Sequence, residues 1–358
     1  MKTPFQVLLA VVCAALILAL PFVISSPTML DEKAEQILER TEGGEEAEDG
    51  EEAAWLRFLV PGALAESTEN DLLIEDVEEG KFSVNSIWEL PVDLSAGPKP
   101  KPEAYTENGY EDESIQVSVE TLEEDGVIWH IGRIRIASPT QLRTGIAGEK
   151  LTSKKTKKVS TMAEMYNAVI ALSGDDYQND PAKTSYEFRM GELIRNKSNK
   201  LKDILIIDEK GDFHLLIKSE GMNTDKNRKV TDIDGFNGTV INAFTFGPAL
   251  VRDGELLTVD TGYGYNPNGK EPRAAIGQTG ELSYLFLIAE GRGDSAGVTQ
   301  QQLADKMFAL GCVQAYNLDG GNSAEMVFNG NVYKGMPGGA ERPLNDIIYF
   351  ATAVPEGE

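Results

Sequence analysis

An aspartate and two glycines follow an apolar segment in residues 317–327, which read NLDGGNSAEMV. A carboxylate at the end of a buried strand, followed by glycines, lies on backbone that can approach a ligand closely. If the amides of residues 320–323 are unpaired, they can together form a concave site for an anion. Asp-Gly is also common in plain turns, so the spacing by itself favours an ordinary strand–turn–strand corner.

Three further segments carry charged residues next to apolar runs of the sequence. AEGR (289–292) sets a carboxylate and an arginine around a glycine, a combination that suits acid–base chemistry and anion binding. LSGDDY (172–177) runs from apolar residues into two aspartates. PRAAIG (272–277) places an arginine before an apolar run, where its guanidinium can bind phosphate or a structural carboxylate. Each segment also fits a charged surface turn.

The elements that must position these groups are mainly strands. Alternating apolar and polar residues on either side of a Gly-containing turn are typical of β-hairpins. Continuous apolar runs of strand length indicate buried strands. The hairpins are predicted at 114–137, 204–217, 248–259 and 324–333, and the buried strands at 282–289 and 313–318.

Two segments have helical spacing. Residues 161–172 begin with Thr161 as a capable N-cap and then run into an apolar stretch. Residues 300–310 follow Thr299, a glutamine three residues later completes a capping box, and Gly311 suits a left-handed C′ position. The predicted fold class is α+β: a mixed, strand-rich sheet domain with a few helices, preceded by a β-hairpin subdomain and an N-terminal transmembrane helix.

The N-terminus predicts a membrane anchor in residues 1–25. Residues 7–24 are almost entirely apolar, with Lys2 before them and acidic residues after them. A cleaved signal peptide is the alternative, although the small-residue cleavage pattern is poor. Both interpretations export the rest of the chain, and we expect a single-pass protein with an extracytoplasmic C-terminal domain.

Residues 26–113 are predicted to form a largely flexible, acidic, Pro-containing stalk. Of the net charge of −25, residues 31–113 contribute 25 acidic and 6 basic residues, too polar a composition to bury a core. No basic face is apparent, which excludes a nucleic-acid partner. A hairpin lead-in is predicted at 114–150 and the main domain at 151–356.

Cysteine and histidine are too scarce for several kinds of site. The chain has two of each, Cys13 and Cys312, His130 and His214, which excludes a disulfide framework and a four-thiolate zinc site. Both histidines fall within predicted strands, which favours structural roles.

No cofactor or metal is expected. Asp175, Asp176 and Asp319 supply oxygen ligands of the kind that Ca²⁺ or Mg²⁺ prefers, but no calcium-loop spacing is present.

The order of these four segments along the chain supports a functional interpretation of them. ALSGDDY, FTFGPALVRDGE, PRAAIGQ, LIAEGR, LGCVQAYNLDGGNSAEMV and ERPLNDIIYF, over about residues 165–350, together resemble the phosphodiester glycosidase family. The 114–150 segment resembles the region that precedes this domain in bacterial members. The resemblance implies hydrolysis of a sugar-1-phosphodiester. It also implies export or anchoring and an association with cell-surface polymers.

The family pattern can be carried over residue by residue. Asp319 matches the aspartate of the family's Asp-Gly-Gly-Gly-Ser motif, Asn322 replaces its third glycine, and Ser323 keeps the serine. Glu290 stands where the family usually has the aspartate of Asp-Gly-Arg, and Arg292 is retained.

Three further positions belong to the same pattern. Ser173 stands where an asparagine commonly precedes glycine, and Arg273 and Arg342 match family arginines. The resulting hypothesis takes Asp319 and Glu290 as the working pair, with assistance from Asp175. The predicted substrate or phosphate ligands are Arg273, Arg292, Gly320, Gly321, Asn322, Ser323 and Arg342.

Two classes of function follow. In the first, the protein is an anchored hydrolase of a phosphorylated glycan or teichoic-acid-like cell-wall polymer. In the second, it is a non-catalytic membrane-anchored module that binds phosphorylated glycan or a protein partner. The carboxylates retained at 175, 290 and 319 favour the enzyme, and the sequence favours no particular oligomeric state.

Overall fold

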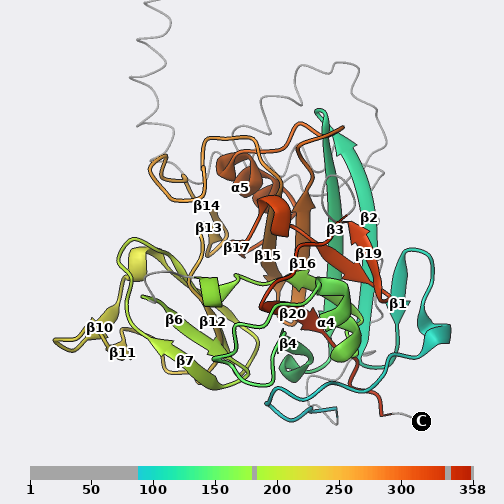
Figure 1. Cartoon of the computed structure of the whole chain (residues 1–358), viewed down its shortest axis with the longest axis horizontal. Helices are drawn as coiled ribbons and strands as arrows, with labels where there is room; N and C mark the ends of the chain where they lie inside the picture. Colours follow the sequence, from blue (N-terminus) through green and yellow to red (C-terminus); the bar gives the residue numbers. More distant parts are fainter. Residues whose placement is uncertain (1–87, 180–183, 335–339, 356–358) are drawn as a thin grey trace, which may run out of the picture. The chain divides into compact units, whose positions relative to one another are not determined.

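Strands account for most of the regular structure in the computed structural model, which describes residues 88–179, 184–334 and 340–355 (Figure 1). The predicted membrane anchor and residues 26–87 of the predicted stalk lie outside the described residues. Within the described ranges, no helix is both long and apolar enough to cross a membrane.

The largest element is an eight-stranded antiparallel sheet in the order β1-β2-β3-β16-β15-β17-β13-β14. Its strands are β1 (Gly109–Glu111), β2 (Ile115–Glu124), β3 (Val127–Ile136), β13 (Ala249–Arg252), β14 (Glu255–Leu256), β15 (Arg273–Gly280), β16 (Ser283–Ala289) and β17 (Gln314–Leu318).

Two five-stranded antiparallel sheets and a small ribbon complete the strands. One sheet, in the order β19-β18-β5-β20-β4, consists of β4 (Leu142–Ile146), β5 (Ile170–Ser173), β18 (Met326–Phe328), β19 (Asn331–Lys334) and β20 (Asp346–Phe350). The other, in the order β7-β6-β12-β8-β9, consists of β6 (Tyr186–Arg189), β7 (Glu192–Asn196), β8 (Ile204–Asp208), β9 (Phe213–Leu216) and β12 (Val240–Phe244). The ribbon pairs β10 (Met222–Thr224) with β11 (Val230–Ile233).

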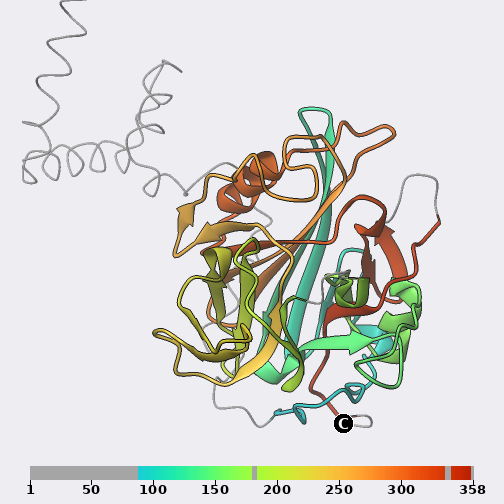
Figure 2. The same cartoon turned by 60° about the vertical axis from the view of Figure 1, so that its left-hand side comes forward.

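The core is layered because alternate side chains of a strand point to opposite faces of its sheet. On β16, Phe286 and Ile288 join the largest apolar cluster, which also contains residues of β5 and β20, whereas Leu285 and Leu287 join a second cluster with α5 (Gln300–Ala309). The opposite face of the β5–β20 sheet packs against α4 (Val159–Met165). Figures 1 and 2 show the two helices on different sheets.

Most of the predicted elements are confirmed, and the α+β class holds in its coarse form: strands predominate and helices are few. The hairpins β8–β9, β13–β14 and β18–β19 form as predicted. The α5 helix begins after Thr299, whose side chain forms a capping box with Gln302, and Gly311 has a φ of 82°.

The predicted helix at 161–172 is wrong at both ends. Helix α4 starts at Val159, ends at Met165 and has Lys158 at the N-cap, so Thr161 lies inside the helix. Asn167 then adopts a φ of 55°, a left-handed conformation that ends a helix. The apolar run that follows is the buried strand β5, because its residues fill the space between two layers.

The predicted lead-in hairpin is present, and it belongs to the main sheet. β2 and β3 pair along their whole length, and β3 in turn pairs with β16 from Trp129 to Arg135. The chain before the hairpin also contacts the domain, since the Arg143 guanidinium donates hydrogen bonds to the carbonyls of Pro91 and Asp93. The described end of the predicted stalk is therefore attached here.

Candidate functional site

The antiparallel register brings three predicted residues to one edge of the eight-stranded sheet. Arg273 opens β15 and pairs with Ala289, the last residue of β16. The next residue of β15 pairs with Leu318, the last residue of β17. Glu290 and Asp319, which directly follow β16 and β17, therefore leave the sheet at the edge where Arg273 enters it.

A second group of acidic residues meets this edge from the β5–β20 sheet. The Asp319 amide donates to the Gly174 carbonyl at 3.3 Å. Gly174 follows β5 and precedes Asp175 and Asp176, and a Cβ at Gly174 would meet the Asp346 carboxylate of β20 at 2.4 Å. The glycine therefore permits the close approach that gathers these carboxylates.

Two cavities meet at Asp319, and both are also lined by Phe246 and Tyr265. The first, of about 180 Å³, is here called the arginine cavity; it is completed by Asn266, Glu271, Arg273, Arg292, Asn317, Leu318, Gly320 and Gly321. The second, of about 250 Å³, is called the carboxylate cavity; it is completed by Asp175, Asp176, Tyr177, Thr184, Glu187, Asn199, Lys202, Thr245 and Arg342. Asp319 can thus act on a ligand that spans both.

The pKa of the Asp319 carboxyl group is raised toward neutral pH. Burial raises its pKa to about 6, and the negative charges of Asp176 and Asp175 act in the same direction. A hydrogen bond from the Ser323 side chain and the charge of Arg342 oppose the rise. A carboxyl group with such a pKa can donate or accept a proton near pH 6, as general acid–base catalysis requires.

Arg342 connects two acidic residues of the site. Its guanidinium nitrogens lie 3.6 Å from Asp176 Oδ2 and 3.7 Å from Asp319 Oδ2. The same group donates a hydrogen bond of 2.7 Å to Ser323 Oγ. Since the Arg342 side chain is 45% exposed, it can also reach a ligand while it holds the two carboxylates.

Asp175 belongs to a buried ionic cluster behind this pair. Arg189 on β6 lies 2.5 Å from Asp175, 2.9 Å from Asp346 and 3.3 Å from Glu187, and all four side chains are at most 2% exposed. Burial raises the pKa of Asp346 to about 7 and raises those of Asp175 and Glu187, because one guanidinium cannot compensate three carboxylates. The carboxyl groups of the cluster are therefore harder to ionise than exposed ones.

The turn after Asp319 is less open than the sequence predicts. The Gly321 amide donates to the Pro272 carbonyl and the Ser323 amide to the Gly320 carbonyl, so two of the four predicted anion donors are engaged within the protein. Gly320 is required because a Cβ there would meet the Pro272 oxygen at 2.8 Å.

The asparagine that replaces the third glycine has a defined partner. Asn322 Oδ1 accepts a hydrogen bond of 2.7 Å from the Arg292 guanidinium. Glu271 Oε2 accepts a hydrogen bond of 2.8 Å from Nε of the same guanidinium. Gly321, with a φ of 57°, lies directly beneath this guanidinium. Asn322 therefore orients Arg292 over the turn, and the Arg292 side chain is still 45% exposed.

Arg273 lines the arginine cavity but is occupied by backbone. Its guanidinium donates to the carbonyls of Tyr265, Asn266, Gly269 and Val298 at 2.7 to 3.3 Å. These bonds hold the loop that carries Tyr265, and burial lowers the Arg273 pKa. The predicted phosphate ligand at this position is thus a loop anchor in the structure.

Glu290 lines neither the arginine cavity nor the carboxylate cavity. Its Oε1 lies 2.5 Å from Nε2 of His130, whose Nδ1 lies 2.8 Å from the Thr121 hydroxyl. Ser173, the third departure from the family pattern, is fully buried in β5. Cys312 is also buried in the core, in keeping with a packing role.

The sequence reasoning missed several residues of the site. Glu187 and Arg189 lie in a segment with no motif, and Lys202 and Tyr265 lie in loops. Glu271, which pairs with Arg292, precedes the PRAAIG segment and could have been found as the nearest acidic residue to Arg273. Among the described residues, no group of histidine, cysteine and acidic side chains has the arrangement of a metal site.

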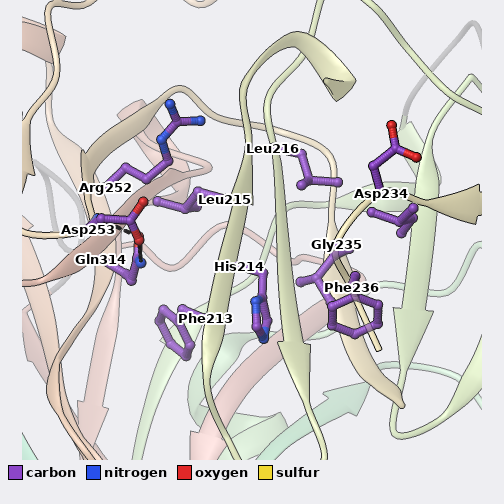
Figure 3. Close-up of a pocket in the computed structure, with 12 residues that line it drawn as sticks. Phe213, His214, Leu215, Leu216, Asp234, Gly235, Phe236, Arg252, Asp253 and Gln314 are labelled. Carbon is purple, nitrogen blue, oxygen red and sulfur yellow. Dashed lines mark hydrogen bonds between the residues drawn. The ribbon is translucent and has the colours of Figure 1, made fainter. Parts of the chain in front are cut away.

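A third cavity, of about 220 Å³, lies elsewhere, around strand β9 (Figure 3). Both apolar and polar side chains line it, and the His214 ring packs edge-on against Phe236 with centroids 5.0 Å apart. His214 Nε2 lies 2.9 Å from Asp208, which supports the structural role expected for this histidine. None of the predicted site residues lines this cavity.

A family model and a curated protein match this chain. The family model described as phosphodiester glycosidase matches residues 166–351, just over half of the chain. The SPbeta prophage-derived uncharacterized protein YomE of Bacillus subtilis (strain 168) is 26% identical over 199 residues, 55% of this chain and 30% of that protein. The chain thus spans less than a third of that relative's length.

Two solved structures resemble this chain to different extents. The zebrafish N-acetylglucosamine-1-phosphodiester alpha-N-acetylglucosaminidase catalytic domain, auto-inhibited by its pro-peptide, has a TM-score of 0.50 and 17% identity, over 72% of this chain and 87% of that chain. A putative exported protein from Burkholderia pseudomallei K96243 has a TM-score of 0.44 and 15% identity, over 63% of this chain and 74% of that chain.

Proposed function

The chain belongs to the phosphodiester glycosidase family, and from this premise we propose that it hydrolyses a sugar-1-phosphodiester in a cell-surface glycan or teichoic-acid-like polymer outside the cytoplasm. The observation that carries the proposal is the position of Asp319, which joins two cavities and has a pKa of about 6. The family gives the reaction class, and the apolar N-terminal segment supports export.

The two cavities suit the two halves of such a substrate. Cleavage of the bond between the anomeric carbon and phosphate passes through an oxocarbenium-like transition state, which negative surroundings stabilise. We place the sugar in the carboxylate cavity, beside Asp176 and Asp319. The phosphate then lies in the arginine cavity, where the half-exposed Arg292 and the amides of Gly320 and Asn322 can bind it.

The pair of catalytic carboxylates that we propose differs from the pair expected from the sequence. Arg342 holds Asp176 and Asp319 together, whereas Glu290 is paired with His130. We therefore propose that Asp319 and Asp176 carry the chemistry and that Asp175 acts indirectly, through Arg189 and through the pKa of Asp319. The good leaving ability of phosphate lowers the demand for a strong general acid.

The test is turnover of a panel of sugar-1-phosphodiesters by the full-length chain, with and without EDTA. We expect Asp319→Asn and Asp176→Asn to lower kcat by about 10²–10⁴-fold, and Glu290→Gln to have a smaller effect. Full activity of Asp319→Asn would refute the assignment. If the folded protein turns over no compound but binds some of them, the non-catalytic binding module is the better description, and loss of turnover in EDTA would indicate a metal.

A further inference from the structure

The segment that carries Arg342 is attached to the start of helix α4. Leu344 and Lys157 exchange two backbone hydrogen bonds, of 2.8 and 2.9 Å. Glu341, the residue before Arg342, accepts a hydrogen bond of 3.0 Å from the Ser160 amide and one of 2.8 Å from the Ser160 hydroxyl. Arg342 therefore lies between two points of attachment, one of which is a carboxylate.

A second glutamate, Glu325, contacts this carboxylate from the chain that leads from Asp319 into β18. Glu325 is only 1% exposed, and no amide, hydroxyl or ammonium group of the described residues donates to its Oε1. Its carboxyl group instead forms a hydrogen bond with the carboxyl group of Glu341. Two ionised carboxylates only accept hydrogen bonds, so one member of the pair must carry a proton.

Glu325 is the member that keeps the proton. Burial, and after it the hydrogen bond with Glu341 and the charge of Glu341, raises the pKa of Glu325 to about 9. Against the effect of its own burial, the hydrogen bonds from Glu325 and Ser160 lower the pKa of Glu341. A protonated Glu325 therefore donates to an ionised Glu341 below about pH 9, and the bond is lost above it.

Other charges near the pair are few. In the described part of the chain, Lys158 is the other charged residue that acts on both glutamates, and its ammonium nitrogen lies 3.6 Å from Glu341 Oε2. The Lys158 side chain is 57% exposed, so solvent screens its charge. Strand β5, which pairs with β18, has no charged side chain. An ionised Glu325 would thus be poorly compensated.

The pair joins the two segments that meet at the proposed catalytic group. Ser323, two residues before Glu325, accepts a hydrogen bond of 2.7 Å from the Arg342 guanidinium, which also lies 3.7 Å from Asp319 Oδ2. Arg342 directly follows Glu341. The interaction between two charges depends on their separation. A change in the contact between the two glutamates therefore alters how Arg342 acts on Asp319.

We propose that the proton shared by Glu325 and Glu341 positions Arg342 beside Asp319, and that loss of this proton at alkaline pH releases the arginine and lowers activity. The inference rests on the proposed function and deepens it, because it adds two positioning residues and a pH dependence to the same site. Both glutamates act through Arg342 and take no part in the chemical step.

The experiment measures kcat/KM of the full-length chain for a sugar-1-phosphodiester from pH 6 to pH 10. Glu325→Ala removes the shared proton, and we expect it to lower kcat/KM about tenfold at pH 7. Glu325→Gln supplies an amide N–H that does not titrate, so it should restore kcat/KM at pH 7. Its kcat/KM relative to wild type should then rise about tenfold between pH 7 and pH 10. Glu164→Gln, at an exposed glutamate of α4, is the matched control and should follow wild type at every pH.

Two kinetic results would overturn the inference. If Glu325→Gln has the same pH profile as wild type, the proton has no role. If Glu325→Ala lowers kcat/KM as much in an Arg342→Gln background as in wild type, the glutamates do not act through Arg342. Glu325→Leu, which fills the same space, replaces the alanine variant if the latter does not fold.

A measurement without substrate separates this inference from the proposed function. If no compound is turned over, the proposed function fails, and urea unfolding decides between the remaining outcomes. The stability gain of Asp319→Asn between pH 4 and pH 8 should be larger in the Glu325→Ala background, because a displaced Arg342 no longer lowers the pKa of Asp319. An equal gain in the two backgrounds overturns the positioning role.

Discussion

Replacing Asp319 by asparagine should lower kcat strongly, as proposed above, and stabilise the fold at neutral pH. The carboxylate is 18% exposed, and its burial beside other acidic groups raises its pKa to about 6. An asparagine keeps the shape and the hydrogen-bonding oxygen but carries no charge. The prediction therefore tests whether the group proposed for catalysis is held in an environment that disfavours its ionised form.

The magnitude follows from proton linkage. A shift of the pKa from 3.8 to about 6 corresponds to about 3 kcal/mol of differential stability. Between these values the folded state binds more protons at Asp319 than the unfolded state does, so the wild type loses stability as the pH rises from 4 to 8. Asp319→Asn lacks this loss, and its stability relative to wild type should increase by about 2 kcal/mol over that interval.

Urea unfolding of both proteins at pH 4 and pH 8 measures this difference. Taking the difference between the two proteins largely cancels the other titrating groups. Asp294→Asn, at an exposed aspartate, is the matched control and should show little pH-dependent gain. If the gain of Asp319→Asn is the same at both pH values, the proposed electrostatic environment of Asp319 is incorrect.

Three further substitutions test the scaffold, each by urea unfolding. Gly320→Ala should cost about 1–3 kcal/mol because its Cβ would meet the Pro272 carbonyl, whereas Gly280→Ala has open space and should be nearly neutral; equal effects would contradict the steric argument. Arg189→Met should destabilise by about 3–5 kcal/mol, since three buried carboxylates lose their counter-charge, and an unchanged stability would show that they are neutral without it. Thr299→Ala should cost about 1 kcal/mol, and no loss would mean that the capping box of α5 contributes nothing.

Local patterns predicted the strands and turns well because they depend on neighbours in sequence. The alternation in β2 and β3, the Asn329-Gly330 turn and the capping box at Thr299 are all present. The helix prediction at 161–172 failed because β5 is a strand only through its pairing with β18 and β20, two strands far away in the chain. The hydrophobic pattern of a ten-residue segment carries no information about pairing with distant strands.

The sequence predicted the central residue of the site, Asp319, but not the contacts that the other predicted site residues make. Asp319 at the end of a strand, followed by glycines, follows from the motif. That Arg273 would be bound by four carbonyls, and that Glu290 would face His130, depends on loops and on a strand over 150 residues away. Lys202 and Arg189 carry no motif at all, because their roles exist only once the sheets are assembled.

The arrangement of charge explains why such a site must be held by a rigid scaffold. Asp175, Glu187 and Asp346 share one arginine in the interior, and buried ionic groups of this kind seldom add net stability. The layers of apolar side chains around them supply that stability. Burial is the main cause that raises the Asp319 pKa to about 6, where proton transfer is efficient, and the charge of Asp175 in the cluster acts in the same direction. Replacing the cluster by apolar residues should therefore stabilise the protein and shift its pH–rate profile toward lower pH, and a profile that does not move would separate the cluster from catalysis.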